Sequence, residues 1–146
     1  MALPQTLHRG PILIINDDED EEFIMEKIFQ ELNTPQERLY FTNTHSAFDY
    51  LANNTPIPFL IICDMMLPME NGVEFKKRVD ELTQMKIKSI PFVFMSNAIS
   101  NTVITDIYTT IALQGAFEKP FEYTELKDLV KIILDYWSVC KQPVVN

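Results

Sequence analysis

Two short apolar runs, each leading into acidic residues, constrain the fold of this chain more than any other feature. Ile12–Ile15 is followed closely by Asp17 and Asp18, and Phe59–Cys63 is followed directly by Asp64. Short runs rich in Ile and Leu are typical of strands buried on both faces, as parallel strands are. Ligands of open α/β sheets bind beyond the carboxyl ends of such strands. The acidic residues therefore mark a candidate binding site.

The positions of these acids predict a metal site, provided that the two strands are neighbours. Asp17 and Asp64 would then converge, with Asp18 as an alternative ligand. Carboxylates that lie close together repel one another, and a hard cation with oxygen ligands relieves this repulsion. We therefore expect Mg²⁺, or Mn²⁺ in its place, at this edge of the sheet.

Short apolar runs alternate with segments of helical period along the rest of the chain, which predicts a parallel sheet with helices on both faces. The strands are expected at Ile12–Ile15, Leu39–Thr42, Phe59–Cys63, Pro91–Met95 and Ala116–Glu118. The helices are expected through Met25–Leu32 to an end near Asn33 and Pro35, and at Ser46–Ala52, Gly72–Leu82, Thr102–Leu113 and Tyr123–Tyr136. Because 146 residues with 47% apolar side chains suffice for one core, we predict a single domain over residues 1–146 with a frayed tail after Ser138.

Composition and charge exclude several classes of function. The net charge of −9 repels nucleic-acid backbones, and the basic run Lys76-Lys77-Arg78 is too short for a nucleic-acid-binding stripe. No segment has the apolar length of a signal peptide or of a membrane span, so we expect a soluble cytoplasmic protein. Cys63 and Cys140 have neither metal-ligand spacing nor the density of a disulfide scaffold, and we expect free thiols.

The order of residues at the strand ends resembles that of the receiver domain of two-component response regulators. The motifs that carry the resemblance are the acids after the first strand, Asp64 after the third, Leu67-Pro68 and Gly72 beyond it, Ser96 after the fourth, and Lys119-Pro120-Phe121 after the fifth. The resemblance covers about residues 11–137. It implies a flavodoxin-like (βα)5 fold, an α/β doubly wound parallel sheet of strand order 2-1-3-4-5, with its switch point between strands one and three.

The resemblance also implies roles for individual residues. Asp64 would accept a phosphoryl group, with Asp17 as a direct metal ligand and the backbone carbonyl of Met66 as a further one. Lys119 would place its ammonium against the phosphoryl group, and Ser96 would donate a hydrogen bond to it. A carboxylate can act as the nucleophile in this way when a metal neutralises the phosphoryl oxygens.

The implied function is signal transduction rather than turnover of a substrate. A sensor histidine kinase or a phosphotransfer protein would load Asp64 in a Mg²⁺-dependent reaction, with only limited self-phosphotransfer and self-dephosphorylation. An unidentified partner would read the loaded state at the face of the fourth helix, fifth strand and fifth helix, through which a homodimer could also form. The resemblance further suggests a cis peptide bond between Lys119 and Pro120, which would aim the lysine inward.

Two departures from the family pattern bear on the site. Asn16 stands at the first position of the acidic pair, where its side chain can hold a metal-bound water; the site carries one charge fewer unless Asp18 is used. Ala116 stands where the family has the aromatic switch residue that is coupled to Ser96. The alternation of a strand points the neighbouring Phe117 to the opposite face.

Other interpretations stay open from the residues alone. An aspartyl-nucleophile phosphohydrolase of the haloacid dehalogenase type needs a proton donor where this chain has Met66, which disfavours that class. Asn16 and Ala116 motivate a receiver that docks without phosphorylation. We expect Glu19–Glu22 to be a solvated helix start, where acids favour the positive end of the helix dipole. The loop beside the acceptor either restricts water or forms a docking surface, and its apolar residues are Met65, Met66, Leu67 and Met69.

Overall fold

Five strands and five helices alternate along the chain in the computed structural model, which describes residues 10–53, 57–83, 90–110 and 114–140. The strands are Ile12–Ile15 (β1), Arg38–Phe41 (β2), Leu60–Cys63 (β3), Phe92–Ser96 (β4) and Gly115–Glu118 (β5). The helices are Glu19–Glu31 (α1), Thr44–Ala52 (α2), Gly72–Thr83 (α3), Asn101–Thr110 (α4) and Tyr123–Val139 (α5). This order confirms the alternation predicted from the apolar runs.

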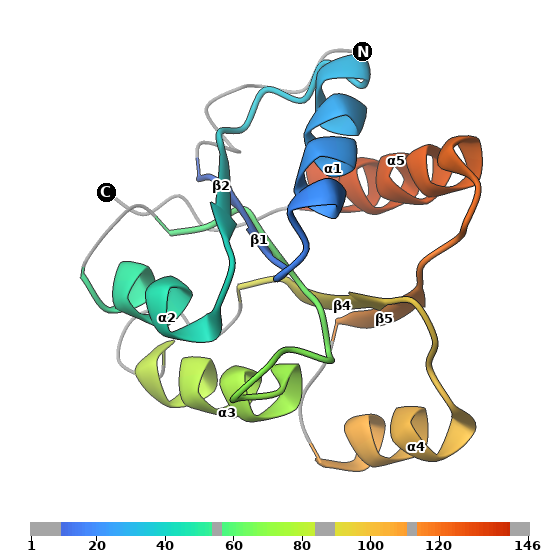
Figure 1. Cartoon of the computed structure of the whole chain (residues 1–146). Helices are drawn as coiled ribbons and strands as arrows, with labels where there is room; N and C mark the ends of the chain where they lie inside the picture. The colour runs from blue at the N-terminus through green and yellow to red at the C-terminus, as the bar shows by residue number, and fades with distance from the viewer. Residues whose placement is uncertain (1–9, 54–56, 84–89, 111–113, 141–146) are drawn as a thin grey trace.

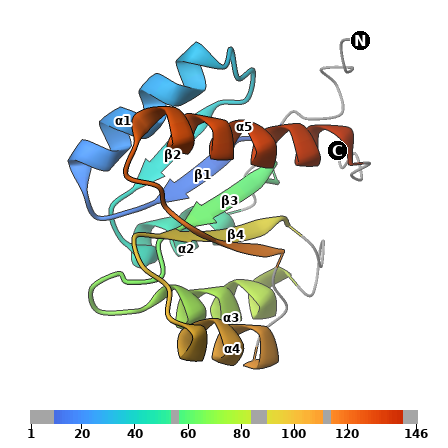
Figure 2. The same cartoon turned by 90° about the vertical axis from the view of Figure 1, so that its right-hand side faces the viewer.

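The strands form one sheet in the order β2-β1-β3-β4-β5, and neighbouring strands are parallel throughout. Helices α1 and α5 cover one face of the sheet, and α2, α3 and α4 cover the other (Figure 1, Figure 2). The arrangement confirms the flavodoxin-like doubly wound fold, with the switch point between β1 and β3.

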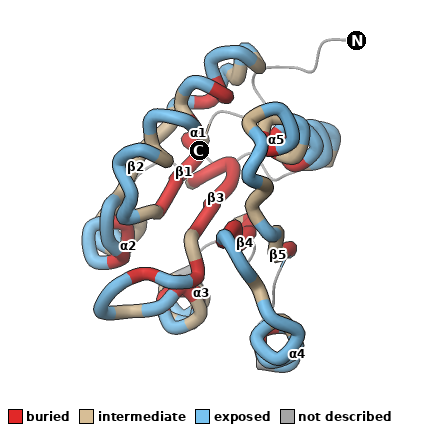
Figure 3. The backbone as a smooth tube through the Cα atoms, turned by 45° about the vertical axis from the view of Figure 1, so that its right-hand side comes forward, coloured by how far each residue is buried: buried red, intermediate tan, exposed pale blue. Residues whose placement is uncertain are grey.

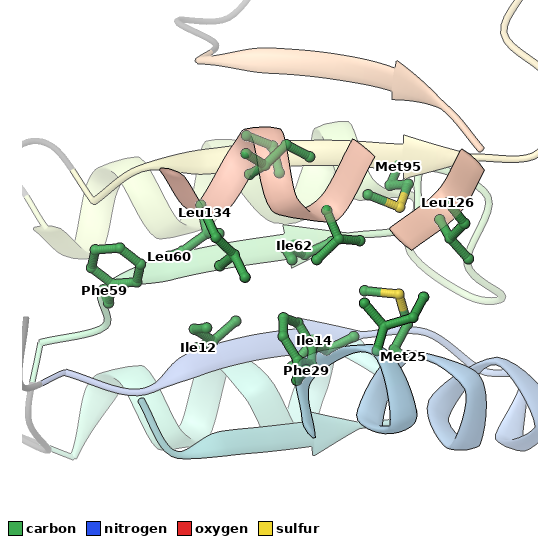
Figure 4. Close-up of a cluster of buried hydrophobic side chains, with 14 residues drawn as sticks. Ile12, Ile14, Met25, Phe29, Phe59, Leu60, Ile62, Met95, Leu126 and Leu134 are labelled. Atoms are coloured by element: carbon green, nitrogen blue, oxygen red, sulfur yellow. The ribbon is translucent and has the colours of Figure 1, made fainter. Parts of the chain in front are cut away.

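The adjacent strands β1 and β3 form the centre of the core, and every residue of both is buried (Figure 3). Their side chains alternate between the faces: Ile14 and Ile62 pack with Phe29 of α1, whereas Ile15 and Cys63 belong to the cluster on the other face. Figure 4 shows the first cluster, in which residues of α1 and α5 meet the strands. Burying one such Ile or Phe fully contributes about 1.5–3 kcal/mol, so this strand pair is a rigid base for the loops that follow it.

Helix boundaries differ from the prediction where capping or packing decides them. Helix α2 begins at Thr44 rather than Ser46, because the side chain of Asn43 accepts a hydrogen bond from the backbone N–H of Ser46 (2.8 Å) and caps the helix. Helix α5 continues through Val139, beyond its predicted end, and the partly buried Trp137 packs against the core cluster beneath it.

Two predicted segments reach outside the described residues. The fourth helix is predicted to end at Leu113, and α4 is described as far as Thr110. The predicted frayed tail after Ser138 overlaps α5 at Val139, while residues 141–146 lie outside the described part of the chain.

Both cysteines are free thiols, as predicted. Burial raises the pKa of the Cys63 thiol well above its usual value, so this residue stays protonated and packs as an apolar side chain. Among the described helices, none combines the length and the hydropathy that crossing a membrane requires.

A polar network ties α1 to β2. The guanidinium of Arg38 donates two hydrogen bonds to the carboxylate of Glu26 (3.0 and 2.7 Å), and the hydroxyl of Tyr40 donates a third (2.7 Å). Arg38 also donates to the carbonyl oxygens of Thr34 and Gln36, which closes the loop between the two elements. The hydrogen bonds from Arg38 are the largest of the effects that lower the pKa of Glu26 to about 2.

Glu26→Gln is expected to destabilise the protein at neutral pH by about 1–2 kcal/mol, after allowance for solvent screening of a partly exposed pair. The folded-state pKa of Glu26 is depressed, so its contribution is present above the ordinary value of 4.5 and is lost as the pH falls toward about 2. Urea denaturation at several pH values measures this: the gap between wild type and variant should narrow below about pH 4.5. Glu81→Gln, an exposed change on α3, serves as the control, and a gap independent of pH would contradict the assignment.

Candidate functional site

The carboxyl ends of β1 and β3 lie side by side and open into one cavity. Ile15 pairs with Cys63, and the backbone N–H of Asp64 donates to the carbonyl of Ile15 (3.0 Å), so the residues after both strands are neighbours. The cavity has a volume of about 370 Å³. Its lining residues are Asn16, Asp17, Asp18, Glu21, Asp64, Met66, Ser96, Asn97 and Ala98. The structure thus brings together the acids that the sequence placed at these strand ends.

The carboxylate of Asp64 is held at one oxygen. Its Oδ1 accepts a hydrogen bond from the hydroxyl of Ser96 (2.9 Å) and another from the backbone N–H of Met66 (2.9 Å). The Ser96 hydroxyl, which is buried at the end of β4, itself accepts from the backbone N–H of Met65 (2.9 Å). Within the described ranges no hydrogen bond reaches the second oxygen, Oδ2. Asp64 therefore has one oriented oxygen and one that makes no hydrogen bond in that part of the chain.

Gly72 allows α3 to pack against the turn that carries Asp64. Its backbone N–H donates to the carbonyl of Met65 (3.0 Å). A Cβ atom at this position would lie 2.7 Å from the ring of Phe94 and 2.9 Å from the carbonyl oxygen of Asp64, closer than such atoms approach. Gly72 was predicted at a helix start. The structure adds that a glycine is required there because the helix backbone lies close to the turn that carries Asp64.

The loop between β3 and α3 is tied down by an ion pair. Arg78 donates two hydrogen bonds of 2.7 Å to the carboxylate of Glu70, and these bonds lower the pKa of Glu70. The apolar residues of the loop divide between the core and the surface. Met65 and Leu67 are buried, whereas Met66 and Met69 are exposed. The loop therefore both packs against the core and presents apolar side chains beside Asp64.

Lys119 directly follows β5 and forms an ion pair with Glu21, an acid that was predicted to be solvated. Its ammonium contacts the carboxylate of Glu21, and the side-chain amide of Asn16 donates to the same carboxylate oxygen. The prediction that Glu21 is only part of a solvated helix start is therefore wrong, since its side chain is mostly buried in this contact. Glu19 and Asp20 of the same turn are exposed, as predicted. One sequence feature could have indicated this contact: Glu21 is an acid in the first turn of the helix that follows Asn16.

The peptide bond between Lys119 and Pro120 is trans, which corrects the expectation of a cis bond. The trans form is favoured by about 0.5–1 kcal/mol before proline, and Lys119 reaches Glu21 from it. The backbone N–H of Lys119 also donates to the carbonyl of Ser96 (2.7 Å), so β4 and β5 stay paired up to the site.

Ala116, at the predicted switch position, and its neighbour Phe117 lie on opposite faces of the sheet, as the alternation of a strand requires. Ala116 pairs with Phe94 across β4 and β5 and packs on the cluster beneath α2, α3 and α4. Phe117 packs on the opposite cluster, beneath α1 and α5, as predicted. The position opposite Phe94 thus carries a methyl group in place of an aromatic ring.

The oxygen donors that line the cavity suit a hydrated magnesium ion, which needs few protein ligands, better than a metal ion held entirely by side chains. In the described part of the chain, no three His, Cys, Asp or Glu residues are grouped closely enough to hold a metal. Mg²⁺ in proteins is bound through one or two carboxylates and keeps several waters. Asp17, Asp64 and the backbone carbonyl of Met66 are oxygen donors of this kind, and all three residues line the cavity together with Asn16.

The family model that matches this chain and three of the solved structures similar to it all belong to response regulators. The family model for the response regulator receiver domain matches residues 12–131. Among solved structures, the Mn²⁺-bound form of response regulator Rcp1 has a TM-score of 0.78 and 19% identity, covering 92% of this chain and 99% of its own. The phosphorylated cyanobacterial phytochrome response regulator RcpA has a TM-score of 0.77 and 23% identity, covering 90% and 95%.

A receiver domain from Rhodospirillum rubrum has a TM-score of 0.77 and 22% identity, and the match covers 93% of this chain and 99% of that one. Identities this low establish the shared fold and nothing finer. A comparison with curated proteins finds no match.

Gly72→Ala is expected to destabilise the protein by about 1–3 kcal/mol, the usual cost of overpacking a filled site. The added methyl group must displace Phe94 or the backbone of Asp64. Urea denaturation measures the loss. Lys77→Ala, an exposed change on the same helix, is the control and should stay within about 0.5 kcal/mol of wild type. Equal stability of Gly72→Ala and wild type would show that the turn adapts without strain.

Proposed function

This chain belongs to the response regulator receiver domain family, and on that premise we propose that Asp64 is its phosphoacceptor. The observation that carries the proposal is the carboxylate of Asp64, with Oδ1 held by Ser96 and Met66 and Oδ2 without a hydrogen bond in the described ranges. The donor of the phosphoryl group would be a phosphohistidine of a sensor histidine kinase or of a phosphotransfer protein, encountered in the cytoplasm.

In the proposed transfer, Oδ2 of Asp64 attacks the phosphorus while the bond from phosphorus to the histidine nitrogen breaks, and the imidazole of the donor leaves. The product is an aspartyl phosphate. The hydroxyl of Ser96, already within hydrogen-bond distance of Asp64, can turn to a phosphoryl oxygen, and the ammonium of Lys119 supplies a positive charge. Return of the phosphoryl group to water would be slow self-dephosphorylation rather than enzymatic turnover.

Asp17 and Asp64, with the backbone carbonyl of Met66, would hold Mg²⁺, or Mn²⁺ as in the related Rcp1 structure. Asn16 would act through a bound water, and Asp18 is the alternative carboxylate if the ion sits further along the loop. The ion would neutralise the phosphoryl oxygens during transfer.

The signal would be read on the face formed by α4, β5 and α5, by a partner protein or by a second copy of the chain. Exposed apolar side chains on the two helices support this choice. They include Val103 and Tyr108 of α4, and Ile132 and Tyr136 of α5. The net charge of −9 argues against nucleic acid as that partner.

A receiver that docks without phosphorylation is the second candidate. It is favoured by Ala116, because a methyl group opposite Phe94 cannot reproduce the inward movement of an aromatic ring that accompanies Ser96 in the family pattern. The two candidates differ in whether Asp64 reacts.

Incubation with acetyl phosphate and Mg²⁺ is expected to add one phosphoryl group, measured by intact-mass spectrometry. Asp64→Asn and a chelator should each abolish the adduct, since the first removes the nucleophile and the second the metal. A folded wild-type protein that stays unmodified both with acetyl phosphate and with a panel of phosphorylated histidine kinases would favour the docking receiver.

Asp17→Ala is expected to abolish Mg²⁺-dependent phosphorylation while leaving circular dichroism unchanged, because Asp17 is exposed and lines the cavity. Asp20→Ala is the matched control: it removes the same charge from the first turn of α1 without touching the cavity, and should react like wild type. Phosphorylation of Asp17→Ala at the wild-type rate would remove Asp17 from the metal site.

A further inference from the structure

The contact between Glu21 and Lys119 joins the first turn of α1 to the segment that follows β5, across 98 residues of sequence. The Lys119 side chain is only 9% exposed and that of Glu21 20%, so the pair is largely withdrawn from water. Opposite charges attract more strongly at such sites than on an open surface, and removing either partner leaves the other uncompensated. The pair is therefore a constraint on where the ammonium of Lys119 lies.

Asn16 fits this arrangement better than an acid would. Its side-chain oxygen accepts from the backbone N–H of Asp18 (2.9 Å), which directs its amide nitrogen toward Glu21. An aspartate at this position would bring a second carboxylate against Glu21 and offer it no donor. The departure of Asn16 from the family pattern and the presence of Glu21 are thus parts of one local arrangement.

The pair also separates Lys119 from the acceptor cavity. Glu21 lines the cavity that contains Asp64, whereas Lys119 lines a neighbouring cavity of about 180 Å³ with Phe121 and Tyr123. Glu21 lines both, and it is the carboxylate that Lys119 contacts in the described part of the chain. A phosphoryl group on Asp64 would therefore have to draw Lys119 away from Glu21.

We propose that Glu21 is a positioning residue: its carboxylate holds Lys119 in the unphosphorylated protein and releases it when Asp64 carries a phosphoryl group. The inference rests on the proposed function. A phosphoryl dianion offers the ammonium more negative charge than a single carboxylate does, which drives the exchange. Glu21 lowers the affinity of the site for phosphoryl groups, because its own contact with Lys119 must be broken first.

The exchange of Lys119 between Glu21 and a phosphoryl group can be tested without a kinase by using beryllofluoride, a phosphoryl analogue. Its affinity for the protein is measured by ¹⁹F NMR in excess Mg²⁺. Glu21→Gln is expected to bind the analogue about three- to fivefold more tightly than wild type, which is the upper part of the range measured for ion pairs at protein surfaces. Glu22→Gln is the matched control, since it removes the same charge from the next residue and lines neither cavity; its affinity should stay within about twofold.

A second pair of variants separates action through Lys119 from a general effect of charge. In a Lys119→Gln background, binding should be weak and Glu21→Gln should no longer strengthen it, because the contact to be broken is absent. Glu21→Asp, whose shorter side chain reaches Lys119 less well at unchanged charge, should bind the analogue more tightly than wild type. Circular dichroism checks that each variant folds. If Glu21→Gln does not fold, Glu21→Asp still tests the proposal.

Several results would overturn the proposal. They are unchanged or weaker binding in Glu21→Gln, an equal gain in Glu22→Gln, or a gain that persists without Lys119. A structural tie between α1 and the segment after β5 would change stability alone and leave the affinity of the folded protein unaltered. Failure of the proposed function looks different: wild type itself would neither bind the analogue nor accept a phosphoryl group, and Glu21 would then have no phosphoryl group to respond to.

Discussion

The parallel pairing of β1 with β3 is the constraint on which the rest of the structure depends. Both strands are buried on both faces and end at polar residues, so a slip in their register would draw Asn16 or Asp64 into the buried sheet and is disfavoured. The register sets Ile15 opposite Cys63, and the backbone of Asp64 continues the ladder by one hydrogen bond. Every polar group of the site is positioned relative to this pair.

The turn that carries Asp64 is then fixed from several sides at once. Ser96 reaches it from β4, Gly72 lets α3 approach it, and the ion pair of Glu70 with Arg78 anchors the loop that follows. A carboxylate held this way at one oxygen would lose little further freedom in the proposed transfer, in which its other oxygen is the nucleophile. In the proposed exchange, the pair of Glu21 and Lys119 is the part of the site that would change its contacts.

The strands and the places of Asp17 and Asp64 after two of them could be predicted because they follow from local pattern: buried runs, helical period and the first charged residue after each strand. The strand order, which makes these two strand ends neighbours, was expected only from the resemblance to the receiver family. The opposite orientations of Ala116 and Phe117 followed from the period of a strand in the same way. The start of α2 was missed by a small margin, because the Asn43 cap depends on one side-chain hydrogen bond. The trans bond before Pro120 was missed because both isomers are close in free energy.

The sequence by itself determined the fold class, the strand ends that form the site and the family to which the chain belongs, since these depend on residue type and spacing along the chain. Only the tertiary structure decided that Glu21 belongs to the site. Its place on an acidic helix start indicated a solvated residue, and its contact with Lys119 exists because α1 and the segment that leads from β5 into α5 lie on the same side of the sheet (Figure 2). Local sequence encodes which residues are charged, whereas the packing of distant elements selects the charges that meet.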